Sequence, residues 1–341
     1  MKNFKLLMES WRGFKKTITE RTAPHYGETY EELRNAITEA KDSVWIFFDT
    51  ETTGLKPEKD YNQVTQIAAV AVKIHGFAEG TSPTIIGQFN QKIALTDRTK
   101  SFMKWEKEKE AQRIAAGEES KFKTTPEILA MTSYGEPRNP REREKRKLSP
   151  EPTKYHTIEE AMNNFVTFCN QYPDKILLAQ NAPFDVGYVN EMFKRFGATP
   201  PDDIVYDTVP IFKQYLAKTV DLKGINMSPG ESMSSEDLNQ DPETHIIDGL
   251  DVSQLFSTNK AGRKFMSVSL GKLIHAFNIE NKGWHDALAD VVMLCEVLGA
   301  AIKWLDKQPE VNQIRNKPRQ IGPETEPPPP KPRAGKASDV E

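Results

Sequence analysis

Residues 44–54 read Val-Trp-Ile-Phe-Phe-Asp-Thr-Glu-Thr-Thr-Gly, an apolar run followed by two acidic residues and a glycine. A continuous apolar run of β-branched and aromatic residues is typical of a central strand that is buried on both faces. Asp49 and Glu51 are two residues apart, so an extended backbone points both carboxylates to the same face. Adjacent carboxylates repel each other unless a cation lies between them. The segment therefore predicts a buried strand that ends in a site for a hard divalent ion such as Mg²⁺ or Mn²⁺.

A second acidic segment, Asn-Ala-Pro-Phe-Asp at 181–185, directly follows the short apolar run at 176–179. This order predicts a strand followed by a helix with proline in its first turn. Asp185 falls in that first turn, where free N–H groups and the helix dipole favour a negative group. Ligands of open α/β sheets bind at the carboxyl ends of the strands, so we expect Asn181 and Asp185 at the same edge as Asp49.

The third segment, His-Asp-Ala-Leu-Ala-Asp at 285–290, opens a helical pattern. Asp286 and Asp290 are one turn apart and share a helix face. His285 is a candidate general base, because imidazole titrates near neutral pH. Each segment alone also fits a structural role, namely solvated acids in a turn, an acid at a helix start or a helix cap.

Together and in this order, the three segments resemble those of the DEDDh (DnaQ-like) exonuclease family of the ribonuclease H-like superfamily. The resemblance covers roughly residues 44–305, with insertions at about 101–150 and 219–265. It implies a three-layer α/β/α fold with a central mixed sheet, in keeping with the alternation of expected strands and helices. It also leaves an N-terminal helical extension at 1–43 and a proline-rich, disordered tail at 306–341.

Further matches support the resemblance to that family, and the position of the histidine indicates its histidine branch. Asp-Thr at 207–208 after a short strand and Leu-Gly-Lys-Leu-Ile at 270–274 both fit the family pattern. The related tyrosine branch places its tyrosine four residues before the last aspartate. Here that position holds Asp286, whereas His285 stands five residues before Asp290.

The resemblance implies a role for each acidic residue. Asp49, Glu51 and Asp290 are expected to bind two divalent ions directly, with Mg²⁺ as the natural ion and Mn²⁺ able to substitute. Asp185 is expected to complete the acidic cluster, directly or through water. His285 is expected to take a proton from the attacking water. All five are therefore candidate catalytic residues.

The resemblance also implies the reaction and its substrate contacts. We expect Thr52 to contact the terminal 3′-hydroxyl, Leu55 to wedge near the last base, and Asn181 to contribute to substrate binding. The implied reaction removes nucleoside 5′-monophosphates from the 3′ end of mainly single-stranded DNA. Two alternatives stay open: the same chemistry on RNA, and a proofreading subunit that acts through a separate polymerase.

Bulk composition sets limits on partners and location. The net charge is −3, so nucleic acid must be bound through a local patch or through metal ions rather than by overall charge. The two cysteines, Cys169 and Cys295, lie in apolar helical patterns, which is typical of reduced core residues. No apolar run reaches the roughly 18–20 residues of a membrane span. We therefore expect a cytoplasmic protein without membrane contact.

The segments outside the motifs carry less specific signals. Apolar residues at helical spacing near the N-terminus predict an amphipathic helix, which either packs on its own domain or binds a protein partner. The basic stretch at 136–150 is either a solvated loop or a flap for nucleic-acid backbone. The proline-rich tail is a second candidate for partner binding. The 219–265 insertion shows little periodicity, which favours a lid or a disordered loop.

Periodicity and turn signals also predict the ordered elements of the core. Strands are expected at 64–74, 84–93, 175–179 and 203–206. Helices are expected at 28–40, 101–117, 125–131, 157–171, 183–196, 208–217, 267–277 and 286–305.

Overall fold

The computed structural model describes most of the region that carries the three acidic segments. The described residues are 26–27, 44–73, 83–118, 125, 128–129, 155–173, 175–198, 205–217, 219–220, 246–258, 264–283 and 285–309. The amphipathic N-terminal helix, the helix expected at 28–40, the basic stretch at 136–150 and the proline-rich tail beyond residue 309 lie outside them.

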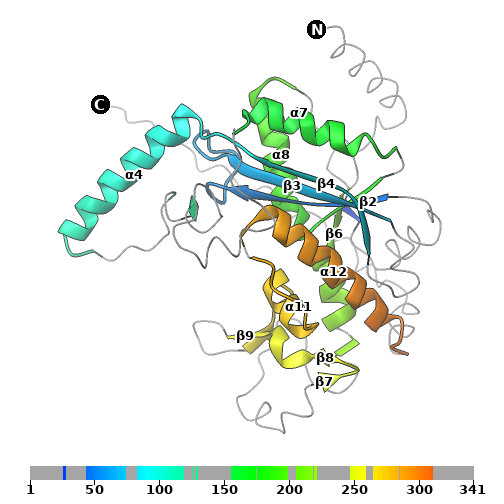
Figure 1. Ribbon diagram of the computed structural model, residues 1–341. Helices are drawn as coiled ribbons and strands as arrows, with labels where there is room; N and C mark the ends of the chain where they lie inside the picture. Colours follow the sequence, from blue (N-terminus) through cyan, green and yellow to red (C-terminus); the bar gives the residue numbers. More distant parts are fainter. Residues whose placement is uncertain are drawn as a thin grey trace, which may run out of the picture.

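A six-stranded mixed sheet forms the centre of the fold (Figure 1). Its strands are β1 (Tyr26–Gly27), β2 (Val44–Thr52), β3 (Val64–Lys73), β4 (Thr84–Lys92), β5 (Ile176–Ala179) and β6 (Val205–Asp207). Their order is β1-β6-β5-β2-β3-β4, and β3 runs antiparallel to both of its neighbours. The parallel pairs are β2 with β5, β5 with β6, and β6 with β1. The five strands other than β1 have the order and the directions of the ribonuclease H-like fold, so the expected fold class is confirmed. The short strand β1 was not expected from the sequence.

Helices cover both faces of the sheet and complete three layers (Figure 1). One face packs against α7 (Ile158–Cys169) and α8 (Ala182–Arg195), and the other against α11 (Leu270–Ala276) and α12 (Ala287–Leu305). Along β2, Trp45 and Phe47 face the α12 layer while Ile46 and Phe48 face the α7 layer, as the period of two requires. Within the described residues, no helix combines the length and apolar character of a membrane span.

Both cysteines are buried and free, one in each helical layer. This confirms the prediction that they are reduced residues of the core. Burial raises the pKa of the Cys295 thiol, which keeps it protonated and unreactive.

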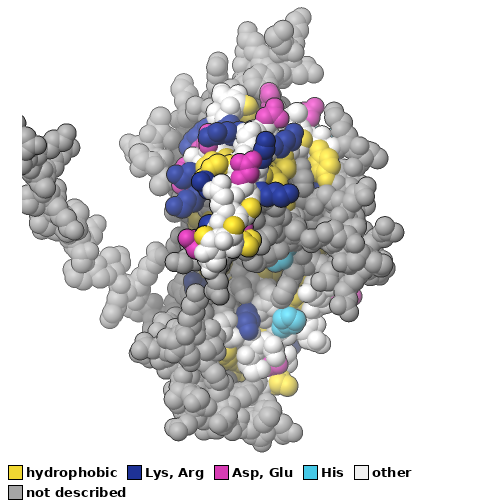
Figure 2. Space-filling view, turned by 90° about the vertical axis from the view of Figure 1, so that its left-hand side faces the viewer, with side chains coloured by type: hydrophobic (Ala, Val, Ile, Leu, Met, Phe, Trp, Pro, Cys, Tyr) yellow, Lys and Arg dark blue, Asp and Glu magenta, His cyan; other side chains and the backbone are white. Residues whose placement is uncertain are grey.

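Local capping explains where the helices begin. A capping box starts α7, which was predicted at 157–171, because the side chains of Thr157 and Glu160 each bond to the other residue's backbone N–H. Helix α4 spans Asp97–Ala115 instead of the predicted 101–117, because the Thr96 side chain caps it by accepting from the Thr99 backbone N–H. This helix projects from the body of the protein (Figure 1), and Lys and Arg lie among hydrophobic side chains on the side it occupies (Figure 2).

Part of the 219–265 insertion belongs to the core, so the prediction of a lid or disordered loop is wrong for residues 246–258. The segment forms β7 (Ile246–Ile247), β8 (Leu250–Asp251), the 3₁₀ helix η4 (Val252–Leu255) and β9 (Phe256–Thr258), which pairs with β10 (Lys264–Met266). Leu250, Val252 and Leu255 are fully buried beside α11. Elements of two to four residues are too short to show a hydrophobic period, which is why the pattern missed them.

Two predicted helices differ from the structure in extent or winding. The helix predicted at 208–217 begins as α9 (Thr208–Ile211) and continues as the π-helix η2 (Phe212–Ala217). The helix predicted at 267–277 begins only at Leu270, after the N-cap Ser269. Element ends depend on such local contacts more than on periodicity.

Candidate metal centre

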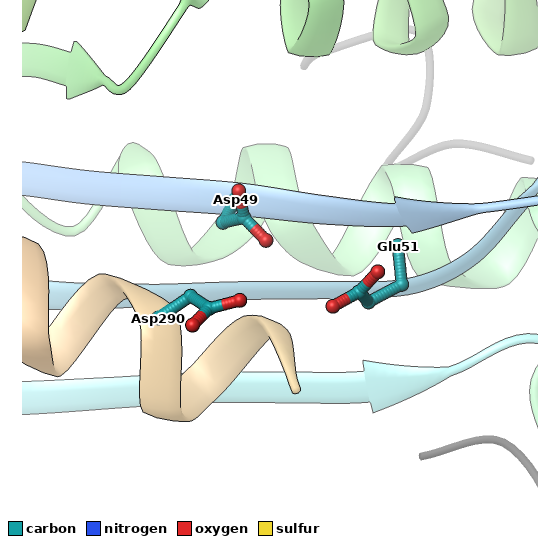
Figure 3. Close-up of side chains that lie close together, drawn as sticks. All are labelled: Asp49, Glu51 and Asp290. Carbon is teal, nitrogen blue, oxygen red and sulfur yellow. The ribbon is translucent and has the colours of Figure 1, made fainter. Parts of the chain in front are cut away.

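Three carboxylates from two elements meet at the end of β2. Asp49 and Glu51 come from β2 and Asp290 from the first turn of α12, and their side chains point toward one another (Figure 3). One oxygen from each lies within 4.8 Å of the others. Among the described residues, no other group of three or more His, Cys, Asp or Glu side chains meets this geometry. The predicted same-face placement of Asp49 and Glu51 is therefore confirmed.

Burial and mutual repulsion favour the protonated form of the carboxyl groups in this cluster. Burial and the nearby Asp286 carboxylate raise the pKa of Asp49 to about 7, against a smaller opposing effect of a hydrogen bond from the Thr50 backbone. Burial followed by the charge of Asp49 raises the pKa of Glu51 and of Asp290 well above the usual range. Hard oxygen donors that are held together and repel one another fit a divalent cation of the Mg²⁺ type.

Asp185 borders the cluster and is hydrogen-bonded to β2 at the residue between Asp49 and Glu51. Its Oδ1 accepts hydrogen bonds from the backbone N (2.9 Å) and the Oγ1 (2.6 Å) of Thr50. Burial and then the charge of Asp49 raise the pKa of Asp185 well above its usual range, although the Thr50 bonds oppose this. One oxygen of Asp185 thus fixes the residue that separates Asp49 from Glu51.

His285 stands at the start of α12 in an unusual backbone conformation. Its φ of 63° lies in the left-handed region, which costs a residue other than glycine roughly 1–3 kcal/mol. A hydrogen bond involving the His285 backbone lowers the pKa of Asp290, so the strained turn supports the cluster. The His285 side chain is exposed.

Asp286 is a fifth carboxylate beside the cluster, and only its capping role was anticipated from the sequence. Its Oδ1 accepts from the backbone N of Leu288 (3.2 Å) and Ala289 (3.3 Å), which confirms that it caps α12. Its Oδ2 accepts from Gln66 Nε2 at 3.3 Å. The negative charge of Asp286 also raises the pKa of Asp49 and Glu51. The one-turn spacing from Asp290 was the signal that could have placed it in the site.

Gln66 joins the site from β3. It lies opposite Glu51 in the β2–β3 register, and its Nε2 also donates to Asn90 Oδ1 on β4 at 2.9 Å. Through Asp286, these contacts connect β3 and β4 to the start of α12. A buried glutamine in a strand carries no motif, so the sequence offered no signal for it.

The predicted substrate residues Thr52 and Leu55 lie around a tight turn at the start of the β2–β3 loop (residues 53–63). Thr52 Oγ1 and Tyr188 Oη both donate to the Gly54 carbonyl, at 2.8 and 2.7 Å. A Cβ at Gly54 would lie 2.6 Å from Asn62 Oδ1, so a larger residue would have to displace the Asn62 side chain, which donates to the Lys56 carbonyl. The Leu55 side chain is 82% exposed.

Arg195, at the end of α8, holds the rest of the β2–β3 loop. Its guanidinium donates to the backbone carbonyls of Asn62 (2.5 Å), Pro57 (2.7 Å) and Lys59 (2.8 Å). Charged donors make stronger bonds than neutral ones, so the loop has a defined shape. No sequence motif marks this residue.

Asn181, the third predicted substrate residue, lies at the start of α8 with a φ of 64°. Its backbone N–H donates to Asp207 Oδ1 at 3.0 Å, and the same oxygen caps α9 by accepting from the Val209 N–H. The Asn181 side chain is exposed and makes no capping bond to its own helix. Asp207, noted in the sequence only as a family match, therefore positions this corner of the site.

Replacing Asp49 with asparagine should stabilise the protein when divalent ions are removed by a chelator. The folded-state pKa of about 7 exceeds the ordinary value of 3.8, so the contribution of Asp49 to stability is full below pH 4 and is lost as the pH rises to 7. A shift of this size corresponds to up to about 4 kcal/mol, reduced by the partial exposure of Asp49. Asp49→Asn should therefore exceed wild type in free energy of unfolding at pH 8 and match it at pH 4.

Urea denaturation at both pH values measures this difference. Glu108→Gln, on the exposed surface of α4, is the matched control and should change stability by no more than about 0.5 kcal/mol. A variant at Asp49 that is no more stable than wild type at pH 8 would contradict the charge repulsion in the cluster.

Comparisons with known proteins find similarity to a DNA polymerase and to exonucleases. No family model matches the chain. Over 170 residues, half of this chain, it is 27% identical to the DNA polymerase III PolC-type of Halalkalibacterium halodurans, of which it covers 8%. It is similar to exonuclease I of E. coli in complex with a dA16 oligonucleotide (17% identity, 80% of this chain, 42% of that chain, TM-score 0.44) and to exonuclease I of Methylocaldum szegediense (14%, 79%, 42%, 0.42). The chain thus spans less than half the length of each of these proteins.

Proposed function

We propose that this chain is a DEDDh (DnaQ-like) 3′–5′ exonuclease that hydrolyses the terminal phosphodiester bond of single-stranded DNA. The observation that carries the proposal is the meeting of Asp49, Glu51 and Asp290 in one cluster, with Asp185 and His285 at its border. These five residues come from three segments that lie far apart in the sequence. All five types match the family motifs.

Asp49, Glu51 and Asp290 would hold two divalent ions, Mg²⁺ or Mn²⁺. When bound, the ions supply charge stabilisation to the attacking and leaving oxygens of the phosphodiester. Asp185 keeps Thr50, and with it the spacing of the two β2 ligands, in place through its hydrogen bonds. Preorganised ligands lower the cost of reaching the reactive geometry.

His285 is the proposed general base, which removes a proton from the attacking water. His285 has a left-handed backbone conformation, and its backbone hydrogen-bonds to Asp290. The residue that carries the imidazole is therefore in direct contact with one carboxylate of the cluster. The β2–β3 loop would receive the 3′-terminal nucleotide, with Thr52 near the sugar and Leu55 against the last base. Leu55 is suited to this contact because it is exposed while the turn around it is held by Tyr188.

Degradation of end-labelled oligonucleotides tests the proposal. Purified protein with Mg²⁺ should convert a 5′-labelled DNA single strand into a ladder that shortens from the 3′ end, and a 3′-labelled strand should release labelled mononucleotide at once. Preferential loss of an RNA strand of the same sequence would move the substrate to RNA. No cleavage of single-stranded DNA, duplex DNA or RNA would overturn the proposal for the isolated chain.

A further inference from the structure

A ladder of three aromatic rings lies beside the β2–β3 loop. The ring centroids of Tyr61 and Phe102 are 3.7 Å apart with an interplanar angle of 12°, and those of Phe102 and Trp105 are 5.4 Å apart at 28°. Tyr61 belongs to the loop, and the other two rings belong to α4. The two hydrophobic core clusters of the described residues do not include this aromatic ladder.

The aromatic ladder does more than attach α4 to the loop. Attachment is already provided by Thr99, whose Oγ1 donates to the Tyr61 carbonyl at 2.8 Å, and by Arg98, which pairs with Asp60 at 2.8 Å. The Trp105 side chain remains 52% exposed. A large aromatic residue placed for packing alone would bury most of its surface, because that burial is its main contribution to stability.

The aromatic ladder begins close to the carboxylate cluster. The Thr53 N–H donates to the Gln63 carbonyl at 3.0 Å and closes the loop, two residues after Glu51 and two residues beyond Tyr61. At about 3.3–3.6 Å per residue and about 5.5 Å across the pair, the Cα atoms of Glu51 and Tyr61 lie within about 20 Å. At about 3.4 Å per nucleotide, a stacked strand covers that span with at most about six nucleotides.

Positive charges accompany the rings on α4. Arg98, Phe102, Trp105 and Lys109 follow each other at intervals of four, three and four residues and so share one face of the helix. Both cationic side chains are exposed, and Arg98 also pairs through its Nε with Asp60. The space-filling view shows Lys and Arg together with hydrophobic and acidic side chains on the side where α4 projects (Figure 2).

Resting on the proposed function, we propose that the aromatic ladder is a base-stacking platform for the single strand whose 3′ end occupies the carboxylate cluster. Trp105 ends the ladder with a ring that is 52% exposed, and an exposed ring flanked by cations is the combination that binds single-stranded nucleic acid, because a base stacks on the ring and phosphates pair with the cations. Every base has an aromatic face, so the platform would accept DNA or RNA of any sequence. Bases inside a duplex are already stacked on their neighbours and have no free faces to offer.

Affinity for a labelled oligonucleotide tests the platform. We would measure the Kd of a 5′-fluorescein-labelled DNA strand of about 20 thymidylates by anisotropy, with Ca²⁺ in place of Mg²⁺ to suppress hydrolysis. Trp105→Ala should weaken binding about 5- to 100-fold, the loss that corresponds to one base stack. Trp105→Phe keeps an aromatic face and should recover most of the affinity. Ile114→Ala is the matched control, because this exposed residue lies two and a half turns away on the opposite face of α4.

Each outcome separates the platform from the hydrolysis. The loss in Trp105→Ala should shrink for strands shorter than about six nucleotides and should be absent for a blunt duplex. Wild-type affinity of Trp105→Ala for the long strand would overturn the platform even if Mg²⁺-dependent hydrolysis continued. Binding that depends on Trp105 without any hydrolysis in Mg²⁺ would support the platform and overturn the nuclease. Circular dichroism of each variant verifies that α4 remains folded.

Discussion

Asp290→Asn is expected to lower kcat/KM for a single-stranded oligonucleotide by at least about 10³-fold, since charge stabilisation by bound metal is worth several kcal/mol. Asp290 is the member of the three-carboxylate cluster that comes from α12. An amide oxygen carries no charge, so the variant should also bind Mn²⁺ much more weakly in calorimetry. The fold should persist, because the pKa of Asp290 is raised by burial and then by its acidic neighbours, so neutralising this carboxylate removes an unfavourable charge.

Asp306→Asn supplies the matched control for this experiment. Asp306 is an exposed carboxylate at the other end of α12, and its replacement should leave kcat/KM and Mn²⁺ affinity unchanged. Near-wild-type hydrolysis by Asp290→Asn would show that the chemistry does not depend on the cluster, whatever the metal affinity.

His285→Ala is expected to reduce kcat by about 10²–10⁴-fold, which is the usual contribution of a general base. KM and Mn²⁺ affinity should change little, because the carboxylate oxygens of the cluster remain. Added imidazole should restore part of the lost rate, since a free base can enter the space that the side chain leaves. Rescue would distinguish proton transfer from a purely structural effect of the strained turn.

The backbone at His285 calls for a second variant. His285→Gly keeps the left-handed φ without strain, so its stability should equal or exceed that of His285→Ala while its rate is equally low. Hydrolysis by either variant at the wild-type rate would show that the base lies elsewhere, with exposed polar groups near α12 as the next residues to replace.

Sequence alone predicted the parts of the site that depend on short-range geometry. The period of two placed Asp49 and Glu51 on one face, and the order of strand and helix placed Asp185 in the first turn of α8. Long-range pairing was not visible, because nothing near Gln66 in the sequence indicates that it meets Asp286, 220 residues away. The same holds for Asp185, whose partner Thr50 is 135 residues distant.

Surface features were the hardest to predict. The α4 segment was expected to be a charged helix, and it is one, but its start depends on the side chain of Thr96. Stacking of Phe102 on Tyr61 requires the β2–β3 loop and the helix to come together in space, and no periodicity encodes that meeting. Patterns identify which residues are buried, whereas contacts between exposed side chains follow from the completed fold.

Helix α8 links the carboxylate cluster at the end of the sheet to the β2–β3 loop. Asp185 in its first turn holds Thr50, Tyr188 holds the Gly54 carbonyl, and Arg195 in its last turn holds three carbonyls of the β2–β3 loop. We therefore expect the loop and the helix to open together as one unit. A fluctuation large enough to release Leu55 with its loop must therefore also loosen the contacts of Tyr188 and Arg195 on α8.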